Sequence, residues 1–327
     1  MNPGLKKLHT LATSFLLLVS IYLQPAIAQK MPALAPNLLV LPSESHELNF
    51  IWQGDSVNNT WEPHAALLLP VKVRGCKKQF YMQFDTGSPS TIFYKSPIQQ
   101  IHARFPKTAT VSDTAKQLLD VNFKVGGMPV SAGAIKLMEY QNPPINWAKK
   151  NSVHIIGTIG TDFIENRVVT INYRSRKILT GTDMPAKMAA KMQLTDFMFV
   201  NRAILLPAVI KGKKKLLYFD TGSSAYSLLT DKKTTELLAQ PGAVPIQYST
   251  RSWDRTLTAH SLATADSIEV ASQKLPIGYS TYIEGSSQNE IDQMMKMGMG
   301  GMLGNKLFRQ SILVLDTKNK KFGVMGK

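Results

Sequence analysis

Short apolar stretches that alternate with polar residues, separated by turns, run along most of the chain. Residues 67–73 and 80–84 flank a Gly-Cys-Lys-Lys turn, and such a pair is typical of a β-hairpin. The same pattern predicts further hairpins at 121–125 with 130–137 and 168–173 with 177–179, and strands at 203–210, 216–219, 267–271 and 312–315. Short helices are expected at 234–239 and after each of two glycine motifs, at 157–160 and 301–304. The pattern therefore predicts a mostly β protein.

The sequence contains two copies of one unit. Phe-Asp-Thr-Gly-Ser occurs at residues 84–88 and again at 219–223, and Leu-Leu-Pro with a lysine-containing turn precedes both. Further along, Gly-Thr-Ile-Gly at 157–160 corresponds to Gly-Met-Leu-Gly at 301–304. Each glycine motif is followed by a strand and a basic turn. Because the matched segments recur in the same order, with length changes in the turns, we infer a duplicated domain.

An aspartate lies at the centre of each Phe-Asp-Thr-Gly-Ser segment. The apolar strand before Asp85 or Asp220 places that carboxyl inside the protein, and the glycine two positions later permits a tight turn. A single buried carboxylate is unfavourable and takes up a proton. Two carboxyls brought together by a pseudo-twofold axis share one proton, because like charges in contact cannot both ionise. One of them can then act as general base on a water molecule while the protonated one polarises a peptide carbonyl.

These features resemble the pepsin and retropepsin clan of aspartic proteases. The resemblance covers residues 64–180 and 200–327 and depends on the paired Phe-Asp-Thr-Gly-Ser segments, the glycine motifs and the basic turns at 171–178 and 315–322. It implies a bilobal acid-protease fold, with two homologous β-barrel-like lobes related by pseudo-twofold symmetry, and an aspartic endopeptidase activity. Because one chain carries both aspartates, a monomer is expected.

The resemblance also implies roles for the matched residues. Asp85 and Asp220 would be the catalytic pair. Two threonines would brace the loops against each other, two glycines would permit the turns, two serines would hydrogen-bond the carboxylates, and two further glycines would let a strand pass beneath each loop. In that order these residues are Thr86 and Thr221, Gly87 and Gly222, Ser88 and Ser223, and Gly160 and Gly304. The six histidines have no ligand-like spacing, so no metal or cofactor is expected.

A flap that closes over the substrate is a further feature of the family. The region expected to form it, residues 102–119, contains no Tyr or Trp, although pepsin-like members carry a tyrosine there. An alternative therefore stays open, in which the chain is a non-catalytic bilobal peptide-binding protein on the same scaffold.

The N-terminus has the features of a targeting segment. Lys6 and Lys7 precede an uncharged stretch at 11–23, and Ala26-Ile27-Ala28 supplies small residues for cleavage, so residues 1–28 are predicted to be a signal peptide. The stretch is too short to span a bilayer, so no integral membrane segment is expected after cleavage. The further predicted boundaries are an N-terminal extension at 29–61, an N-terminal lobe at 62–184, a linker at 185–199 and a C-terminal lobe at 200–327. The extension could be a prosegment, although an N-terminal strand and linker is the favoured interpretation.

Composition limits the classes of function. The chain has 327 residues, of which 44% are hydrophobic and 18% charged, which excludes a disordered or coiled-coil protein. The single cysteine, Cys76, excludes an intrachain disulfide, and an exported protein without disulfides fits a bacterial periplasm or exterior. The net charge of +16 would also suit a basic adhesion protein of the cell envelope. The lysines at 211–215 fall in a hairpin turn, so the expected partner is a peptide or protein substrate and not a nucleic acid.

Overall fold

The structure is a computed structural model that describes residues 34–57, 60–108, 110–111, 116–140, 143–252, 255–284 and 299–326. The chain divides into two units, Met1–Ala35 and Pro36–Lys327, and the sheets and helices described below belong to the second unit. The predicted signal peptide at residues 1–28 lies outside the described residues, as do residues 112–115 of the expected flap.

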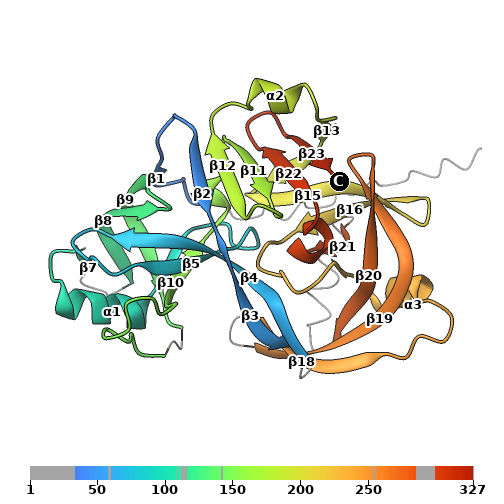
Figure 1. Ribbon diagram of the computed structural model, residues 1–327, viewed down its shortest axis with the longest axis horizontal. Helices are drawn as coiled ribbons and strands as arrows, with labels where there is room; N and C mark the ends of the chain where they lie inside the picture. Colours follow the sequence, from blue (N-terminus) through green and yellow to red (C-terminus); the bar gives the residue numbers. More distant parts are fainter. Residues whose placement is uncertain are drawn as a thin grey trace, which may run out of the picture. The chain divides into compact units, whose positions relative to one another are not determined.

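Two large sheets form the two lobes (Figure 1). In each sheet, one strand leads directly into a Phe-Asp-Thr-Gly-Ser segment. The first sheet, counted over the described residues, has nine strands in the order β1-β9-β6-β10-β5-β4-β8-β7, with β3 paired to β4. Helix α1 (Lys95–Arg104) follows β6. The strands are β1 (Leu39–Val40), β3 (Ile51–Val57), β4 (Thr60–Val73), β5 (Phe80–Phe84), β6 (Ile92–Tyr94), β7 (Thr110–Val111), β8 (Gln117–Val125), β9 (Met128–Met138) and β10 (Ile155–Ile159).

The second lobe repeats this arrangement with later parts of the chain. Its sheet has eight strands within the described ranges, in the order β14-β15-β16-β21-β17-β20-β19-β18. Helix α3 (Lys232–Leu238) follows β17 and begins at Asp231, whose side chain accepts a hydrogen bond from the Thr234 amide. The strands are β14 (Met198–Val200), β15 (Ala203–Ile210), β16 (Lys213–Phe219), β17 (Leu228–Leu229), β18 (Ile246–Ser252), β19 (Arg255–Val270), β20 (Gln273–Glu284) and β21 (Met299–Leu303).

A third sheet joins the two halves of the chain. Its order is β13-β23-β22-β11-β12-β2, and β11 pairs antiparallel with β22 from Val168 opposite Asp316 to Asn172 opposite Ile312. Two short 3₁₀ helices, η1 and η2, precede β11 and β22. The remaining elements are β2 (His46–Asn49), η1 (Thr161–Phe163), β11 (Val168–Asn172), β12 (Lys177–Gly181), α2 (Ala186–Ala189), β13 (Thr195–Asp196), η2 (Asn305–Phe308), β22 (Ile312–Asp316) and β23 (Lys321–Met325).

Alternating burial explains why these segments become strands. In β5, Phe80, Met82 and Phe84 are fully buried while the residues between them are partly exposed. Gly126 and Gly127 make the turn between β8 and β9 with positive φ angles of 57° and 107°, which favour glycine. In each lobe, one strand runs parallel beside the strand that ends in Phe-Asp-Thr-Gly-Ser, as β10 beside β5 and β21 beside β16. The mostly β, bilobal fold predicted from the sequence is confirmed.

Several elements differ from the sequence prediction in extent. The first expected strand, at 67–73, is the second half of β4, which begins at Thr60 and pairs with β3. Helix α1 was not predicted, because its only buried residues are Pro97, Ile98 and Ile101. The predicted extension at 29–61 contains β1, β2 and β3, which pair with strands of the first and third sheets. Among the described residues, no helix has the length and apolar character needed to cross a membrane.

Candidate active site

The two Phe-Asp-Thr-Gly-Ser segments form two loops that meet at the centre of the molecule. Each loop is anchored to its own lobe, because the Asp85 amide donates to the Ile159 carbonyl at 3.0 Å and the Asp220 amide donates to the Leu303 carbonyl at 2.9 Å. Asp85 and Asp220 are each only 9% exposed. The structure therefore brings the two predicted aspartates together from positions far apart in the sequence.

Two threonines connect the loops by reciprocal hydrogen bonds. The Thr86 amide donates to Thr221 Oγ1 and the Thr221 amide donates to Thr86 Oγ1, both at 2.9 Å. Each hydroxyl in turn donates to the strand before the opposite loop, Thr86 to the Phe219 carbonyl at 2.9 Å and Thr221 to the Phe84 carbonyl at 2.7 Å. All four bonds are buried, so they fix the separation of the two aspartates.

The loop glycines leave room for the carboxyls. A Cβ atom added at Gly87 would lie 2.7 Å from Asp220 Oδ1 and 2.9 Å from Asp85 Oδ1. A Cβ atom at Gly222 would lie 2.5 Å from Asp85 Oδ1. Either side chain would push the aspartates apart, so the need for glycine here is steric and not only conformational.

The glycines that end the downstream motifs also meet backbone at close range. A Cβ atom at Gly160 would lie 2.7 Å from the Ser88 carbonyl oxygen. A Cβ atom at Gly304 would collide with the carbonyl oxygens of Ser223 and Tyr226. These two positions let β10 and β21 continue directly beneath the active loops.

Hydrogen bonds to the two carboxyls are similar but not equivalent. Asp85 Oδ1 accepts from the Gly87 amide at 2.8 Å, and Asp220 Oδ1 accepts from the Gly222 amide at 2.7 Å. The Ser223 hydroxyl donates to Asp220 Oδ2 at 2.8 Å, as the resemblance implies. The Ser88 hydroxyl does not do the same.

The expected role of the Ser88 hydroxyl is wrong. This hydroxyl donates to the Ser90 carbonyl at 2.8 Å, and it is the backbone amide of Ser88 that faces the Asp85 carboxyl. The two loops differ after the serine, since Pro89 follows Ser88 whereas Ser224 follows Ser223. A proline restricts the backbone of the residue before it, and in this loop the Ser90 carbonyl lies within reach of the hydroxyl.

Burial and the neighbouring acid both act on the first aspartate. Burial raises the pKa of the Asp85 carboxyl well above its ordinary value, and the charge and hydrogen bond of Asp220 raise this pKa further. The amides of Gly87 and Ser88 act in the opposite direction but are weaker causes. These effects favour the protonated form of the Asp85 carboxyl.

A cleft of about 760 Å³ lies over the two aspartates. One wall contains Tyr94 and Tyr140, whose rings stack with centroids 4.4 Å apart. Another wall comes from the β3–β4 hairpin, which contributes Gln53, Asp55 and Ala65 among others. A further hollow of about 370 Å³ shares Asp55 and Ala65 with the cleft and continues to β18 and β19. The site is thus an extended groove and not a closed cavity.

Sequence reasoning did not identify the cleft tyrosines. The Tyr94 hydroxyl and Thr158 Oγ1 lie 2.9 Å apart in a buried hydrogen bond, and burial raises the pKa of Tyr94 to about 12. The Tyr218 hydroxyl donates to the Thr86 carbonyl at 3.1 Å. Tyr94 follows shortly after the first active loop and Tyr218 directly precedes Phe219, so the closeness of both to the motifs was a signal that could have been used.

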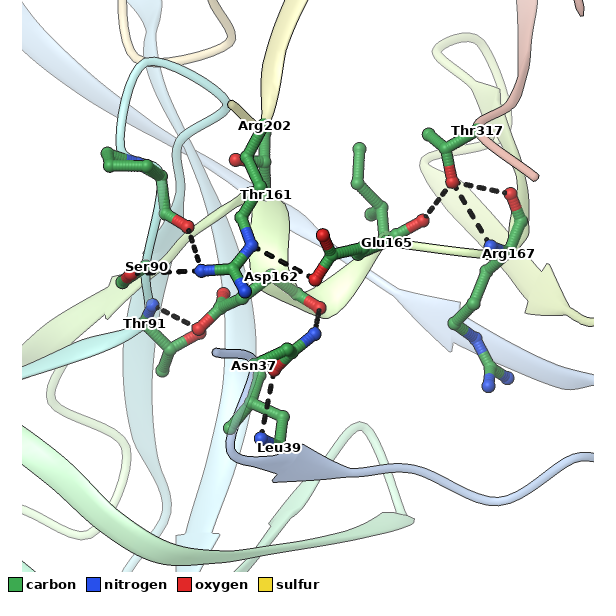
Figure 2. A network of polar contacts seen from close by, with 12 residues as sticks. Asn37, Leu39, Ser90, Thr91, Thr161, Asp162, Glu165, Arg167, Arg202 and Thr317 are labelled. Carbon is green, nitrogen blue, oxygen red and sulfur yellow. Dashed lines mark hydrogen bonds and ion pairs between the residues drawn. The ribbon is translucent and has the colours of Figure 1, made fainter. Parts of the chain in front are cut away.

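Polar residues after the glycine motifs hold the loops in place and were also missed. Asp162 accepts from the Thr91 amide at 2.6 Å and from the Thr91 hydroxyl at 2.8 Å, and Figure 2 shows this contact within a larger network. In the second lobe, Asn305 donates to the Thr221 carbonyl at 2.8 Å and to Ser224 Oγ at 2.6 Å. Asp162 directly follows Gly160 and Thr161, and Asn305 directly follows Gly304, so their closeness to the glycine motifs was the signal available in the sequence.

Part of the expected flap is described. β7 pairs with β8 through Thr110 opposite Leu119 and Val111 opposite Leu118, which forms a short hairpin whose connecting residues 112–115 lie outside the described ranges. The second lobe has a longer hairpin at the equivalent place, formed by β18 and β19. β18 also contacts β3. The hairpins whose residues line the groove are β3–β4 and β18–β19, whereas no described residue of the expected flap at 102–119 lines it.

Comparisons with known proteins add one structural similarity. No protein-family model matches the sequence, and no curated protein matches it. Among solved structures, the chain is similar to an aspartic proteinase from Irpex lacteus, with 13% sequence identity and a TM-score of 0.48. This similarity covers 87% of the present chain and 98% of the other chain. The function proposed below is based on the geometry of the site in this chain.

Proposed function

We propose that this protein is an aspartic-type endopeptidase that hydrolyses peptide bonds with a water molecule activated by Asp85 and Asp220. The observation that carries the proposal is the buried contact between the two carboxyls, which raises the pKa of Asp85. Asp85 then keeps its proton where an ordinary aspartate is ionised. One protonated and one ionised carboxyl are together an acid and a base in the same site.

In the proposed reaction, the water molecule lies between the two carboxyls. The ionised carboxyl of the pair takes a proton from the water as the water oxygen attacks the peptide carbonyl carbon, and the protonated carboxyl gives its proton to the carbonyl oxygen. The resulting tetrahedral diol collapses and the carbon–nitrogen bond breaks. The carboxyl that took the water's proton gives it to the departing amine, and the other carboxyl takes back the proton of one diol hydroxyl, so that the pair again holds one proton. No bond forms between substrate and protein.

The cleft supports an extended peptide as the substrate. It runs from the paired tyrosines, Tyr94 and Tyr140, across the aspartates towards β18 and β19. A folded protein surface cannot enter such a groove as easily as a flexible chain can. We therefore propose that unstructured segments of proteins are cleaved.

We further propose that the mature protein is exported and acts as a monomer. Residues 1–28 have the charge and apolar pattern of a signal peptide. Both aspartates come from one chain, so no second copy is needed to complete the pair.

The experiment is a cleavage assay on an unfolded, fluorescently labelled protein between about pH 3 and pH 8. Cleavage is expected under acid to mildly acidic conditions. Asp85→Asn and Asp220→Asn are each expected to lower the rate by a factor of about 10³ or more, with folding preserved by circular dichroism. Asp196→Asn is the matched control, because this carboxyl is 83% exposed and pairs only with Lys321 in a surface contact.

Each result has a defined meaning. Full activity in either dyad variant would contradict the assignment of Asp85 and Asp220. If the unmutated protein binds peptides but never cleaves them, the peptide-binding alternative is favoured. Salt-dependent binding to anionic envelope material that survives both replacements, without cleavage, would favour the adhesion function.

A further inference from the structure

A second pocket, of about 510 Å³, lies where three distant segments of the chain meet. The β3–β4 hairpin supplies Trp52 and His64. The turn after β11 supplies Tyr173, Arg174 and Arg176, and Arg309 follows η2. None of these residues lines the cleft over the aspartates. The pocket is therefore a separate feature of the surface.

The charge of this pocket is strongly positive. Three of its lining residues are arginines, and none is acidic. Within the described part of the chain, the side chains of Arg174 and Arg176 make no hydrogen bond or ion pair. Arg309 uses only Nη1 in its contacts with Glu62 Oε1 at 3.5 Å and His64 Nδ1 at 2.8 Å. Most guanidinium donors in the pocket are thus available to a ligand.

The acid beside Arg309 is already engaged. Glu62 Oε2 accepts from Lys306 Nζ at 2.9 Å, and Oε1 faces Arg309. The Glu62 carboxylate therefore already faces two cations, Lys306 and Arg309, and does not balance the charges of Arg174 and Arg176. The pocket lacks the anion that would balance its guanidinium groups.

Aromatic rings form a rigid wall beside these cations. Trp52 and Tyr173 stack with centroids 6.4 Å apart and planes at 15°, and His64 meets Trp52 edge-on at 5.2 Å. A charge-assisted hydrogen bond from a guanidinium group to an anion is stronger than a neutral one, and the rings shape the side of the pocket beside the arginines.

We infer that this pocket binds a phosphate group. A carboxylate is matched by one guanidinium fork, whereas a phosphate monoester carries up to two negative charges and three oxygens that accept hydrogen bonds. Three guanidinium groups, two from the turn after β11 and one after η2, suit a phosphate group better. Nothing in this inference depends on the peptidase function, because the pocket and the cleft share no lining residue.

The equivalent turn of the second lobe offers a contrast. There the turn between β22 and β23 carries Lys318 and Lys320, and Lys318 Nζ lies 3.9 Å from Asp183 Oδ1. Lysine is a point charge without the planar fork of arginine, and neither lysine lines the phosphate pocket. Replacing the two arginines of one turn or the two lysines of the other therefore removes the same charge, once inside the pocket and once outside it.

The test is a titration of the whole protein with inorganic phosphate, against sodium chloride at the same ionic strength, followed by tryptophan fluorescence and melting temperature. Saturable binding is expected. The double variant Arg174→Gln with Arg176→Gln should weaken binding at least about tenfold, and Lys318→Gln with Lys320→Gln should leave it within about twofold. Arg176→Lys, which keeps the charge but loses the fork, should also weaken binding and covers the case in which the double variant does not fold.

A second arm separates the sources of the phosphate. Sedimentation with vesicles of phosphatidylglycerol and phosphatidylcholine, compared with phosphatidylcholine alone, reports a lipid headgroup. Vesicle binding that is lost only in the arginine variants identifies the headgroup as the source, and phosphate binding without vesicle binding identifies a soluble phosphate. The inference is overturned if no saturable phosphate effect occurs, or if the lysine variants lose binding as much as the arginine variants do.

Discussion

Ser88 and Ser223 occupy equivalent positions in the two active loops, but only the Ser223 hydroxyl donates to an aspartate. The additional hydroxyl donor on Asp220 favours keeping the shared proton on Asp85. Burial and the neighbouring carboxyl raise the pKa of Asp85 in the same sense. A small difference in the residue after each serine thus accompanies different hydrogen-bond partners for the two aspartates.

The first prediction at this scale concerns stability and pH. Because the folded-state pKa of Asp85 is raised, its favourable contribution is fully present below the ordinary value of 3.8 and is lost as the pH rises through the raised value. Asp85→Asn is therefore expected to increase the free energy of unfolding at neutral pH, with little effect near about pH 3. Urea unfolding at both pH values measures this. A variant that is less stable than the unmutated protein at neutral pH would contradict it.

At the scale of elements, the β3–β4 hairpin is the feature that the two sites have in common. Gln53 and Ala65 line the cleft, whereas Trp52 and His64 line the phosphate pocket. Glu62 attaches the hairpin to the second lobe through Lys306 and Arg309. This hairpin therefore connects the geometry of the cleft with that of the pocket.

The anchor of the hairpin is expected to persist in acid. Burial acts to raise the pKa of Glu62, but the hydrogen bond and charge of Lys306, with smaller contributions from His64 and Arg309, outweigh it and leave this pKa below the ordinary value of 4.5. The stabilisation from Glu62 is then present above that ordinary value and is lost only as the pH falls through the lowered one.

Glu62→Gln is predicted to loosen the hairpin. Hydrogen exchange of the β3 and β4 amides, measured by mass spectrometry at mildly acidic pH, should become about tenfold faster, equivalent to about 1.4 kcal/mol. Glu47→Gln is the control, since its ion pair with Lys177 is half-exposed and lies in β2. Equal exchange in the Glu62 variant and the unmutated protein would show that the ion pairs do not hold the hairpin.

At the scale of the whole molecule, several further connections hold the lobes together. The threonine bonds lie at the centre, the third sheet combines strands from both halves, and Arg202 reaches from the start of the second lobe to the first. Arg202 Nε donates to Glu165 at 3.0 Å, and Nη1 lies 3.5 Å from Ser90 Oγ (Figure 2). The Arg202 side chain is only 4% exposed, so this link is inside the protein.

Arg202→Gln is predicted to lower the free energy of unfolding by about 3 kcal/mol, because it leaves a partly buried carboxylate without its partner. Arg202→Lys should recover only part of the loss, since lysine cannot reproduce the forked contacts. Denaturant unfolding measures both values, and Lys321→Gln, in a surface ion pair with Asp196, is the control. A loss no larger than that of the control would show that Arg202 does not join the lobes energetically.

The repeated motifs allowed the fold and the positions of the aspartates to be predicted, because a duplicated Phe-Asp-Thr-Gly-Ser constrains both the strand and the turn. The bracing of Thr86 against Thr221 was likewise expected from the resemblance, and the structure places both threonines in reciprocal bonds. These features depend on short segments of sequence. The assignment of Asp85 and Asp220 as catalytic stays a prediction.

Other parts of the site could not be predicted, because they depend on tertiary contacts between distant segments. Tyr94 and Tyr140 stack in the wall of the cleft although helix α1 and the strands β7 to β9 separate them in sequence. The role of the Ser88 hydroxyl was predicted from the equivalence of Ser88 and Ser223. The backbone after Ser88 instead places the Ser90 carbonyl where it accepts from this hydroxyl. The phosphate pocket likewise combines arginines from distant segments that no local pattern connects.

The most direct test of the account is a titration of the Asp85 carboxyl by ¹³C nuclear magnetic resonance, in the unmutated protein and in Asp220→Asn. In the unmutated protein, Asp85 is expected to titrate well above 3.8. In the variant, the pKa of Asp85 should fall because the neighbouring charge is gone, yet stay above 3.8 because the carboxyl is still buried. An Asp85 that titrates at its ordinary value, or that does not respond to Asp220→Asn, would contradict a shared proton between the two aspartates.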